Sequence, residues 1–251
     1  MDHQNADIRR NLYGETPDAG ADPAAPRLTG QILGVFTGPA ALFRRMAGTP
    51  RWGQALLTCM AATLGMVLIW ASRVDADALL RPILERDPRL APELVGRAIE
   101  IQGRLLGLLG ALAVLVGLPA AHLLLAALLW LIGRAAPGPA GSPGYRQALC
   151  AAVLPSLASL PKALLISCIC LARPVSGLKP NQLSPLSLGA WFESGQARLD
   201  ALLTGFDLFT AAGLVLLFLA GRHVLGLRSG AALGCAAAGA LLTAALLTLG
   251  G

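Results

Sequence analysis

Charged side chains are scarce in this chain of 251 residues, and their scarcity excludes most soluble globular proteins. Only 14% of the residues are Asp, Glu, Lys or Arg, whereas a soluble domain typically has about a quarter. Residues 105–133 contain only His122 as a titratable side chain, and residues from Ser229 onward contain no charge at all. Soluble core helices keep one polar face, so segments without charge on any face favour a membrane protein.

The sequence also has few of the residues on which catalysis and metal binding depend. It contains three histidines in total, and no Ser/His/Asp order, HExxH, P-loop or paired-carboxylate motif is present. A histidine-based metal site is therefore disfavoured, and we expect no enzymatic activity, no metal and no cofactor. The net charge of +6 comes from basic residues spread over several loops rather than one face, which argues against nucleic acid as a partner.

What the chain has instead is a set of long apolar stretches. They run at about 54–72, 105–133, 147–172, 199–221 and 229–250. A hydrocarbon core of about 30 Å needs about 20 apolar residues in a helix, whose backbone groups are all satisfied internally. We therefore expect an all-α polytopic membrane protein, a bundle of five transmembrane helices in contact with the lipid bilayer. The first stretch begins too late for a cleavable signal peptide, so we expect it to act as an uncleaved anchor.

Two segments precede the first of these stretches. Residues 1–30 are mostly polar with Gly, Pro and Ala, which predicts a disordered tail. The membrane domain then covers 31–251. Residues 31–46 are largely apolar but too short to span, so they predict an amphipathic interfacial segment in which Pro39 begins a short helix at its first turn.

The first connecting segment, 73–104, is the most highly charged part of the sequence. It holds six Arg and six acidic residues together with three prolines. Apolar residues at helical spacing predict two short amphipathic helices separated by a turn at Asp87–Pro88. We expect this extramembrane helical loop to be a solvated face rather than a site.

Lys162 and Asp207 are charged residues that fall well inside the predicted spans. A charge in the hydrocarbon region is costly unless it is paired or hydrated, so both are functional candidates. By rise per residue they lie roughly 15 Å and 12 Å from the same membrane face, which permits a buried ion pair. Two other readings stay open at this point: Lys162 snorkels while Asp207 lies near the interface, or the two form a proton or substrate relay.

Two prolines interrupt the third stretch. Pro155 and Pro161 each remove a backbone hydrogen bond, which predicts kinks in the helix. In transporters, broken helices of this kind line substrate sites. A structural kink is the simpler interpretation, because a transporter usually has more spans and more intramembrane polar groups.

Small residues at a spacing of four predict close helix packing. Gly103 and Gly107 lie at the start of the second stretch, and Gly230, Gly234 and Ala238 lie within the fifth. Such residues let helix backbones approach closely in lipid. The partner helix could belong to the same chain, to a second copy in a homo-oligomer, or to another membrane protein.

Charge does not determine the orientation by simple counting. With the N-terminus in the cytosol, seven Lys and Arg near the spans face the cytosol and nine face the other side. The loops 134–146 and 222–228 contain no acidic residue, which weakly favours a cytosolic location for these two loops.

Three segments share their order and features with a known family. They are an interfacial lead-in followed by Pro-x-Trp, a third span entered through an aromatic–basic pair and broken by prolines, and a fourth span with Asp-x-Phe near its start and a short basic turn after it. In this chain they read GVFTGPAALFRRMAGTPRWGQALL (34–57), YRQALCAAVLPSLASLPKALL (145–165) and LLTGFDLFTAAGLVLLFLAGRHVLGLRSGAAL (202–233). They resemble the bacterial branch of the Ypt-interacting-protein (YIP) domain family of five-span membrane proteins.

The resemblance implies a topology and a general role. It implies a bacterial inner-membrane protein with five spans, a cytosolic N-terminal tail and a C-terminus on the far side, and it offers no catalytic residues. Our leading hypothesis is a non-enzymatic scaffold or partner-binding module. The alternative is a small transporter or permease that uses the Pro-kinked third span with Lys162 and Asp207, and an intramembrane enzyme ranks third.

Overall fold

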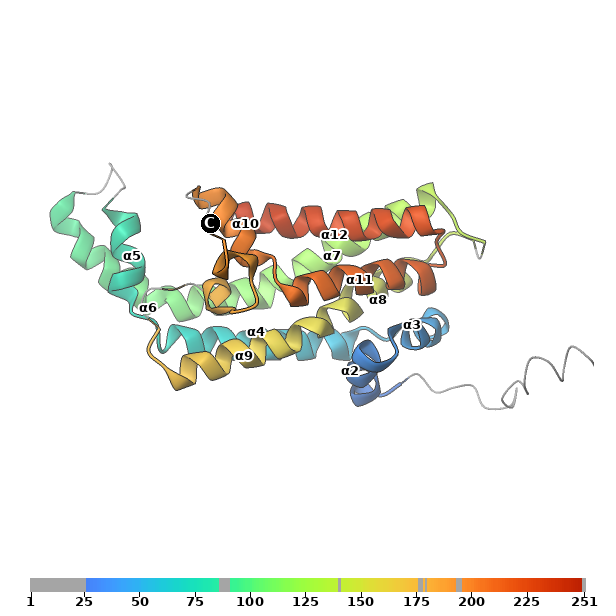
Figure 1. Ribbon diagram of the computed structural model, residues 1–251, viewed down its shortest axis with the longest axis horizontal. Coiled ribbons are helices and arrows are strands. Elements are labelled where there is room, and N and C mark those ends of the chain that lie inside the picture. Colours follow the sequence, from blue (N-terminus) through green and yellow to red (C-terminus); the bar gives the residue numbers. More distant parts are fainter. Residues whose placement is uncertain are drawn as a thin grey trace, which may run out of the picture.

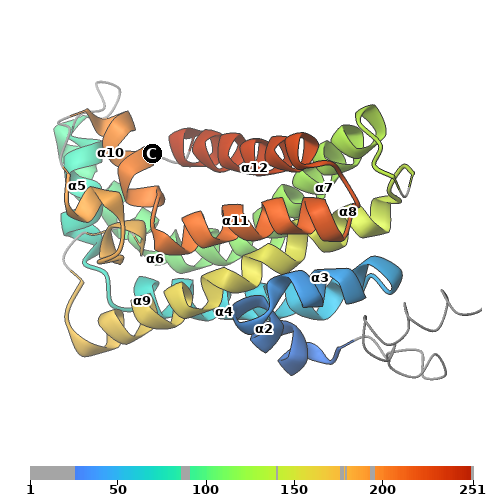
Figure 2. The same cartoon turned by 45° about the vertical axis from the view of Figure 1, so that its right-hand side comes forward.

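The computed structural model describes residues 26–85, 91–139, 141–175, 178, 180–192 and 196–249. Its described part is built from helices that lie side by side along the long axis of the molecule (Figure 1, Figure 2). Four of them are long and apolar enough to cross a membrane: Gly53–Ala71, Pro92–Ala135, Tyr145–Ala172 and Ser229–Thr248. The prediction of a helical membrane protein is therefore supported, with four candidate spans by length and composition.

The fourth predicted stretch, 199–221, is not one helix, which corrects the sequence-based boundary. It consists of α10 (Ala197–Gly205) and α11 (Leu208–His223), and Phe206 and Asp207 between them have extended backbone. Glycine weakens a helix and aspartate prefers the N-cap position, so one helix ends at Gly205 and the next begins after Asp207. The restarted helix has only 16 residues, which is why it falls short of the length of the other four.

The second predicted stretch is part of a longer helix. The short helix η1 (Pro92–Leu94) leads into α6 (Val95–Leu112), which continues through a π-helical segment, η2 (Ala113–Gly117), into α7 (Leu118–Ala135). Pro119 in the first turn of α7 cannot donate to the preceding turn, and the wider π turn accommodates that missing bond. The second loop helix predicted after Asp87–Pro88 is thus the beginning of this long helix. The turn itself lies outside the described residues.

The helix α5 (Ala76–Leu84) pairs with the start of α6 and projects from the bundle (Figure 1). Leu80 and Leu84 pack against Val95 and Ile99 from α6. Asp75 caps α5 by accepting hydrogen bonds from the backbone of Asp77 and Ala78 at 3.0 and 3.3 Å. On the exposed face Arg81 donates to both carboxylate oxygens of Asp77, which lowers the pKa of that carboxyl.

The N-terminal region forms two helices where one interfacial helix was expected. They are α2 (Leu28–Thr37) and α3 (Pro39–Gly48), and Pro39 occupies the first turn of α3. Phe43 and Met46 are completely buried beneath α3, which packs against α8 and α11. The predicted tail of 1–30 falls mostly on residues outside the described part, and its last three residues belong to α2.

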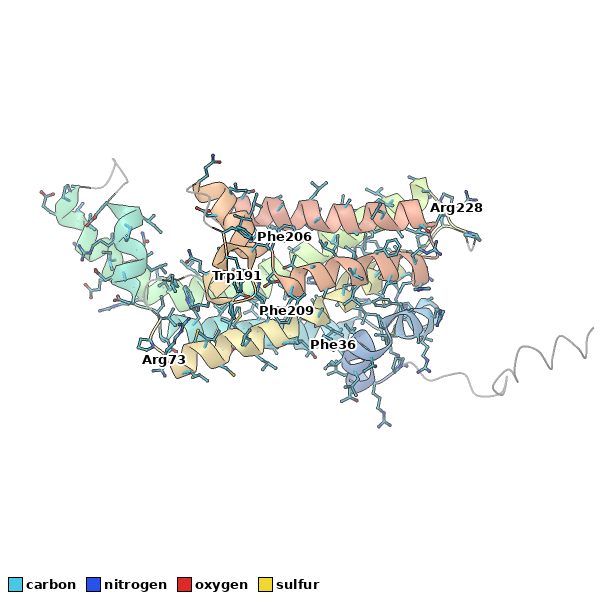
Figure 3. The ribbon with its side chains drawn as sticks, in the orientation of Figure 1. Phe36, Arg73, Trp191, Phe206, Phe209 and Arg228 are labelled. Carbon is cyan, nitrogen blue, oxygen red and sulfur yellow. The ribbon has the colours of Figure 1, made fainter. Side chains whose placement is uncertain are left out.

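The bundle has two distinct ends. At the end that we call the N-terminal end lie α2, α3, the 134–146 loop and the 222–228 turn (Figure 1). At the opposite C-terminal end lie α5, α10 and the end of α12 (Ser229–Leu249) (Figure 1, Figure 2). Trp191, in the loop before α10, lies at the C-terminal end as well (Figure 3).

Candidate functional site

The structure brings Lys162 and Asp207 together. The Nζ atom of Lys162 lies 2.7 Å from Oδ2 of Asp207, and their side chains are 17% and 0% exposed. Lys162 belongs to the first turn of α9 (Leu160–Ala172), and Asp207 is the N-cap residue of α11. The ion pair therefore ties the middle of the third apolar segment to the start of α11.

The carboxylate of Asp207 accepts a full set of hydrogen bonds. Its Oδ2 faces Lys162 and also accepts from the hydroxyl of Ser184 at 3.4 Å. Its Oδ1 accepts from the backbone N–H of Thr210 at 2.8 Å and from the hydroxyl of Thr210 at 2.9 Å. An ionised carboxylate offers about four lone-pair sites, so four donors occupy them. A buried charge with its partners in place is stable in a region of low dielectric constant.

The segment 180–192, which we call the cap segment, is hydrogen-bonded to the backbone at Phe206 and Asp207. Ser187 pairs with Asp207 through an isolated antiparallel bridge, and the N–H of Leu188 donates to the carbonyl of Phe206 at 2.9 Å. Leu183 packs into a second apolar cluster with Trp70 and Ile166. Irregular backbone is tolerated at membrane depth only where protein covers it, and these contacts supply that cover. The side chains of Lys162 and Ser184 both contact Oδ2 of Asp207, and we call these three residues the polar latch.

The third apolar segment changes its helical form between its two prolines. It comprises α8 (Tyr145–Val153), the 3₁₀ helix η3 (Leu154–Ser159) and α9. Pro155 stands in the first turn of η3 and Pro161 in the first turn of α9. Each proline leaves one carbonyl of the preceding turn without its usual donor. The hydroxyls of Ser156 and Ser159 donate to nearby backbone carbonyls, both at 2.6 Å, so the break is supported locally.

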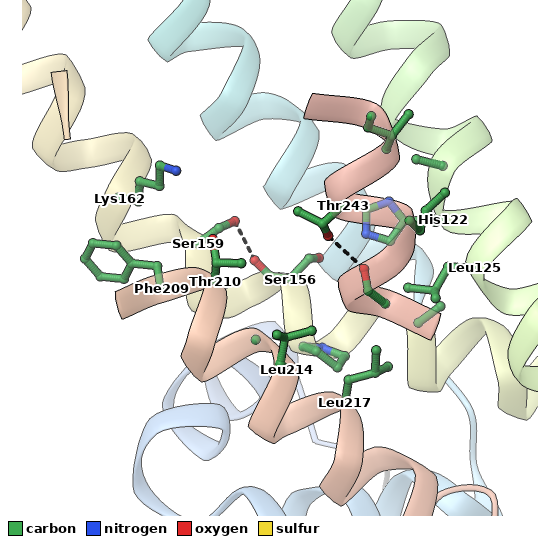
Figure 4. A pocket seen from close by; sticks show the side chains of 17 residues that line it. His122, Leu125, Ser156, Ser159, Lys162, Phe209, Thr210, Leu214, Leu217 and Thr243 are labelled. Atoms are coloured by element: carbon green, nitrogen blue, oxygen red, sulfur yellow. Dashed lines mark hydrogen bonds between the residues drawn. The ribbon is translucent and has the colours of Figure 1, made fainter. Parts of the chain in front are cut away.

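A cavity of about 280 Å³ lies beside this break. It is lined by residues of α7, α8, η3, α9, α11 and α12, and its walls are mainly apolar (Figure 4). Its polar lining residues are His122, Ser156, Ser159, Lys162, Thr210 and Thr243. The position of the latch at one edge of the cavity makes this region the candidate site.

Sequence reasoning selected Lys162 and Asp207 but did not select the hydroxyl residues around them. His122 also lines the cavity, and its Nδ1 lies 2.8 Å from the carbonyl oxygen of Leu118. Ser156 and Ser159 carry a local signal, since two serines between two prolines mark a broken span. Ser184 carries no such signal, because its contact with Asp207 depends on how the chain folds back.

The predicted packing residues fall into two groups. A Cβ atom added at Gly103 would lie 2.9 Å from the Cβ of Ala76, and one at Gly107 would lie 3.7 Å from the Cβ of Ala71. These two glycines face α5 and α4 within the chain. Gly230 and Gly234 have no other atoms within 4 Å of an added Cβ, and Ala238 is half-buried. The residues of α12 that pack inside the chain include Ala232, Cys235 and Gly239.

The described residues contain no group of three His, Cys, Asp or Glu side chains arranged to hold a metal ion. A comparison with protein families gives one finding: the family model of the Yip1 domain matches residues 33–250. Comparisons with curated proteins and with solved structures give no match. The family match covers most of the chain and agrees with the resemblance noted from three of its segments.

Proposed function

The chain belongs to the Yip1 domain family, and we propose that it works as a non-enzymatic membrane scaffold whose basic end binds partners. It is a membrane protein with several apolar spans. In this proposal it lies in the bacterial inner membrane, crosses it five times and keeps its N-terminus in the cytosol. The fifth crossing is α11, which is about 24 Å long at 1.5 Å per residue. The cap segment extends this crossing at the C-terminal end of the bundle, where α11 begins.

The placement of the two termini supports an odd number of crossings. The helices α2 and α3 lie at one end of the bundle, and the end of α12 lies at the other (Figure 1). Topology reporters fused after Gly251 test this. A periplasmic signal agrees with five crossings, whereas a cytosolic signal together with a cytosolic N-terminus excludes them.

One observation carries the proposal: among the residues that the structure describes, the N-terminal end presents arginines without any acidic residue. Eight of them come from separate helices and loops and all are exposed: Arg27, Arg44, Arg45, Arg51, Arg134, Arg146, Arg222 and Arg228. The surrounding segments 26–54, 134–147 and 221–229 contain no Asp or Glu. Basic residues next to spans favour the cytosolic side and attract anionic headgroups. The same field favours partners with an acidic contact surface.

This basic end is also held firmly in place. Helix α3 carries Arg44 and Arg45 outward while Phe43 and Met46 are 0% exposed beneath it. At the base of the neighbouring loop, Arg134 lies over the ring of Trp130 at 5.0 Å from its centroid, and Trp130 meets Tyr145 edge to face. Partner groups can thus bind charges whose spacing is already set, which lowers the ordering cost of binding.

The test compares charge reversal at the two ends. In Arg44→Glu/Arg45→Glu the basic end loses two of its charges, and the control Arg97→Glu/Arg104→Glu changes two exposed arginines of α6 at the other end. Crosslinking and pull-down from native membranes should recover partners with wild type and the control but not with the first variant. Equal recovery with both variants would contradict binding at the basic end.

The cavity and Lys162 favour a second candidate, a small transporter or permease. In that case the Lys162–Asp207 pair must release or exchange a proton or substrate during transport. The four donors that surround Asp207 support a structural role instead, because exchange would require breaking several of these bonds.

A further inference from the structure

We propose that the cavity between α11 and α12 holds one acyl chain of a membrane phospholipid. The proposal concerns a binding site within the bundle and is independent of partner binding at the basic end. It depends on the composition of the walls, on the hydrogen bonds already made there, and on the way in which the cavity reaches the outer surface.

The walls suit a hydrocarbon chain. Leucines from three helices form much of the lining: Leu125 from α7, Leu214 and Leu217 from α11, and Leu242 and Leu246 from α12. Phe209, Pro155 and small residues such as Gly213 complete it. Sites for small molecules are typically concave and mostly apolar with a few polar groups at defined places, and here the apolar part extends along the helices.

The hydroxyl groups in the walls have no proton to offer a ligand. Ser156, Ser159 and Thr243 each donate to a backbone carbonyl of their own segment, at 2.6, 2.6 and 2.9 Å. Thr210 has acceptors in Asp207 and in the carbonyl of Gly205. The Nδ1 of His122 faces a carbonyl, so the proton of a neutral ring lies on Nδ1 and its other nitrogen is an acceptor. A ligand rich in acceptors, such as a sugar or a phosphate buried deep in the cavity, would find few donors there.

Lys162 is the exception, and it stands at one edge. It is the only charged side chain among the described residues that line the cavity. An ammonium group has three protons, and the contact with Asp207 uses one of them. The ester carbonyl at the head of an acyl chain is an acceptor that this ammonium can bind. A single donor next to an apolar cavity therefore matches the chemistry of an acyl ester.

The depth of Lys162 fits this arrangement. From the tight turn at the N-terminal end, α11 extends about 24 Å and α12 about 31 Å. Asp207, at the start of α11, therefore lies within about two helical turns of the far end of α12. Measured along α11 and α12, Lys162 and the mouth of the cavity therefore lie toward the C-terminal side of the hydrocarbon layer, the side from which a lipid ester would approach. The apolar part of the cavity extends inward from there.

The cavity continues onto the lipid-facing surface. Near the N-terminal end α11 and α12 are in close contact, since a Cβ atom added at Gly221 would lie 3.2 Å from both the Cα and the Cβ of Ala232. Toward the C-terminal end the two helices diverge (Figure 2). The lining residue Leu246, close to that end, is 50% exposed. A lipid chain can therefore enter sideways between the two helices.

Two glycines provide a matched pair of variants. Gly213 lines the cavity and Gly234 does not. An added Cβ at either position meets no other atom within 4 Å. A leucine at Gly213 would occupy the space that the acyl chain needs, while a leucine at Gly234 would make the same chemical change outside the cavity. Thr243→Leu is a second cavity-filling variant from the opposite wall.

The test uses phosphatidylglycerol with a diazirine in its acyl chain, mixed into phosphatidylethanolamine vesicles that contain the full-length protein. After photolysis, residue-level mass spectrometry compares labelling inside the cavity, at Leu214 and Leu242, with labelling at the outward-facing Leu233 and Leu241, which are 63% and 72% exposed. Gly213→Leu and Thr243→Leu should lower labelling inside the cavity about tenfold, because the added side chain fills the space. Labelling of the outward leucines should not change.

The control Gly234→Leu should keep the labelling inside the cavity at the wild-type level. Gel filtration shows whether each variant remains folded, and either cavity-filling variant that does so serves the test. Cavity labelling that persists in a folded cavity-filling variant would overturn the proposal. Cavity labelling absent from wild type, as expected if the cavity holds a water-soluble molecule, would overturn it as well.

Discussion

The two ends of the bundle are held by different kinds of contact. At the N-terminal end, α3 is attached by apolar side chains, chiefly Phe43 and Met46. At the C-terminal end, the cap segment and α11 are joined to α9 by the latch of Lys162, Asp207 and Ser184. Apolar packing accepts many apolar replacements, whereas a buried ion pair does not accept the loss of one partner. The end that presents arginines is therefore robust, and the opposite end depends on one pair of charges.

The largest effect should come from breaking the latch. Lys162→Leu leaves the buried carboxylate of Asp207 without its counter-charge, and we expect a loss of about 3–5 kcal/mol in the free energy of unfolding. Unfolding in mixed micelles, followed by circular dichroism, measures it. Lys162→Arg retains the charge and is the control. A loss below about 1 kcal/mol would mean that the pair is hydrated and contributes little.

The corresponding change at the N-terminal end should have a smaller effect. Met46→Ala removes a fully buried side chain, and we expect a loss of about 2–3 kcal/mol, in the lower part of the range for such truncations because α3 can relax toward the bundle. Met46→Leu should be nearly neutral. The same unfolding assay applies, and equal losses for the leucine and alanine variants would contradict apolar packing as the attachment.

A polar contact outside the latch should matter less. Asp75 is the N-cap residue of α5, a helix at the C-terminal end of the bundle. Asp75→Ala should lower the free energy of unfolding by about 1 kcal/mol through the loss of that cap. Hydrogen exchange of the α5 amides should rise while that of α9 and α11 stays unchanged. Increased exchange in α11 would show that α5 and the latch unfold together.

The smallest effect on stability should come from the surface of the basic end. Arg44→Gln/Arg45→Gln changes two exposed side chains and should alter the free energy of unfolding by less than about 0.5 kcal/mol. Binding to vesicles with anionic lipid headgroups, or recovery of partners, should nevertheless fall. A large loss of stability would show that these arginines hold α3 in place rather than present charge.

Much of the helical membrane architecture could be predicted from the sequence, because uncharged apolar stretches leave few other folds available. The approach of Lys162 and Asp207 was foreseen as one of several readings, since rise per residue places them at similar depths. The division of 199–221 was not foreseen, because a hydropathy average over that stretch conceals one capping aspartate. The π-helical segment before Pro119 was missed because that proline was not weighed.

Other features depend on contacts between distant parts of the chain. The charge count of seven against nine could not separate the two sides, since arginines of the 73–104 segment were counted without the acidic residues beside them. The fold places the 134–146 loop, the 222–228 turn and α3 at one end (Figure 1). Only then do their exposed arginines come together, with no acidic residue in these segments. Likewise, Ser184 joins the latch only through the fold of the cap segment, and the cavity exists only where several helices pack together.

The most direct test of a structural latch in a rigid scaffold is a double-mutant cycle with Lys162→Leu, Asp207→Leu and the combined variant. Each protein is measured for its free energy of unfolding and for recovery of partners from native membranes. Our account predicts that both single variants are destabilised, that the combined variant regains most of that loss because no unpaired charge remains, and that it still recovers partners. Normal stability in all three variants, together with the loss of a transport activity, would contradict it.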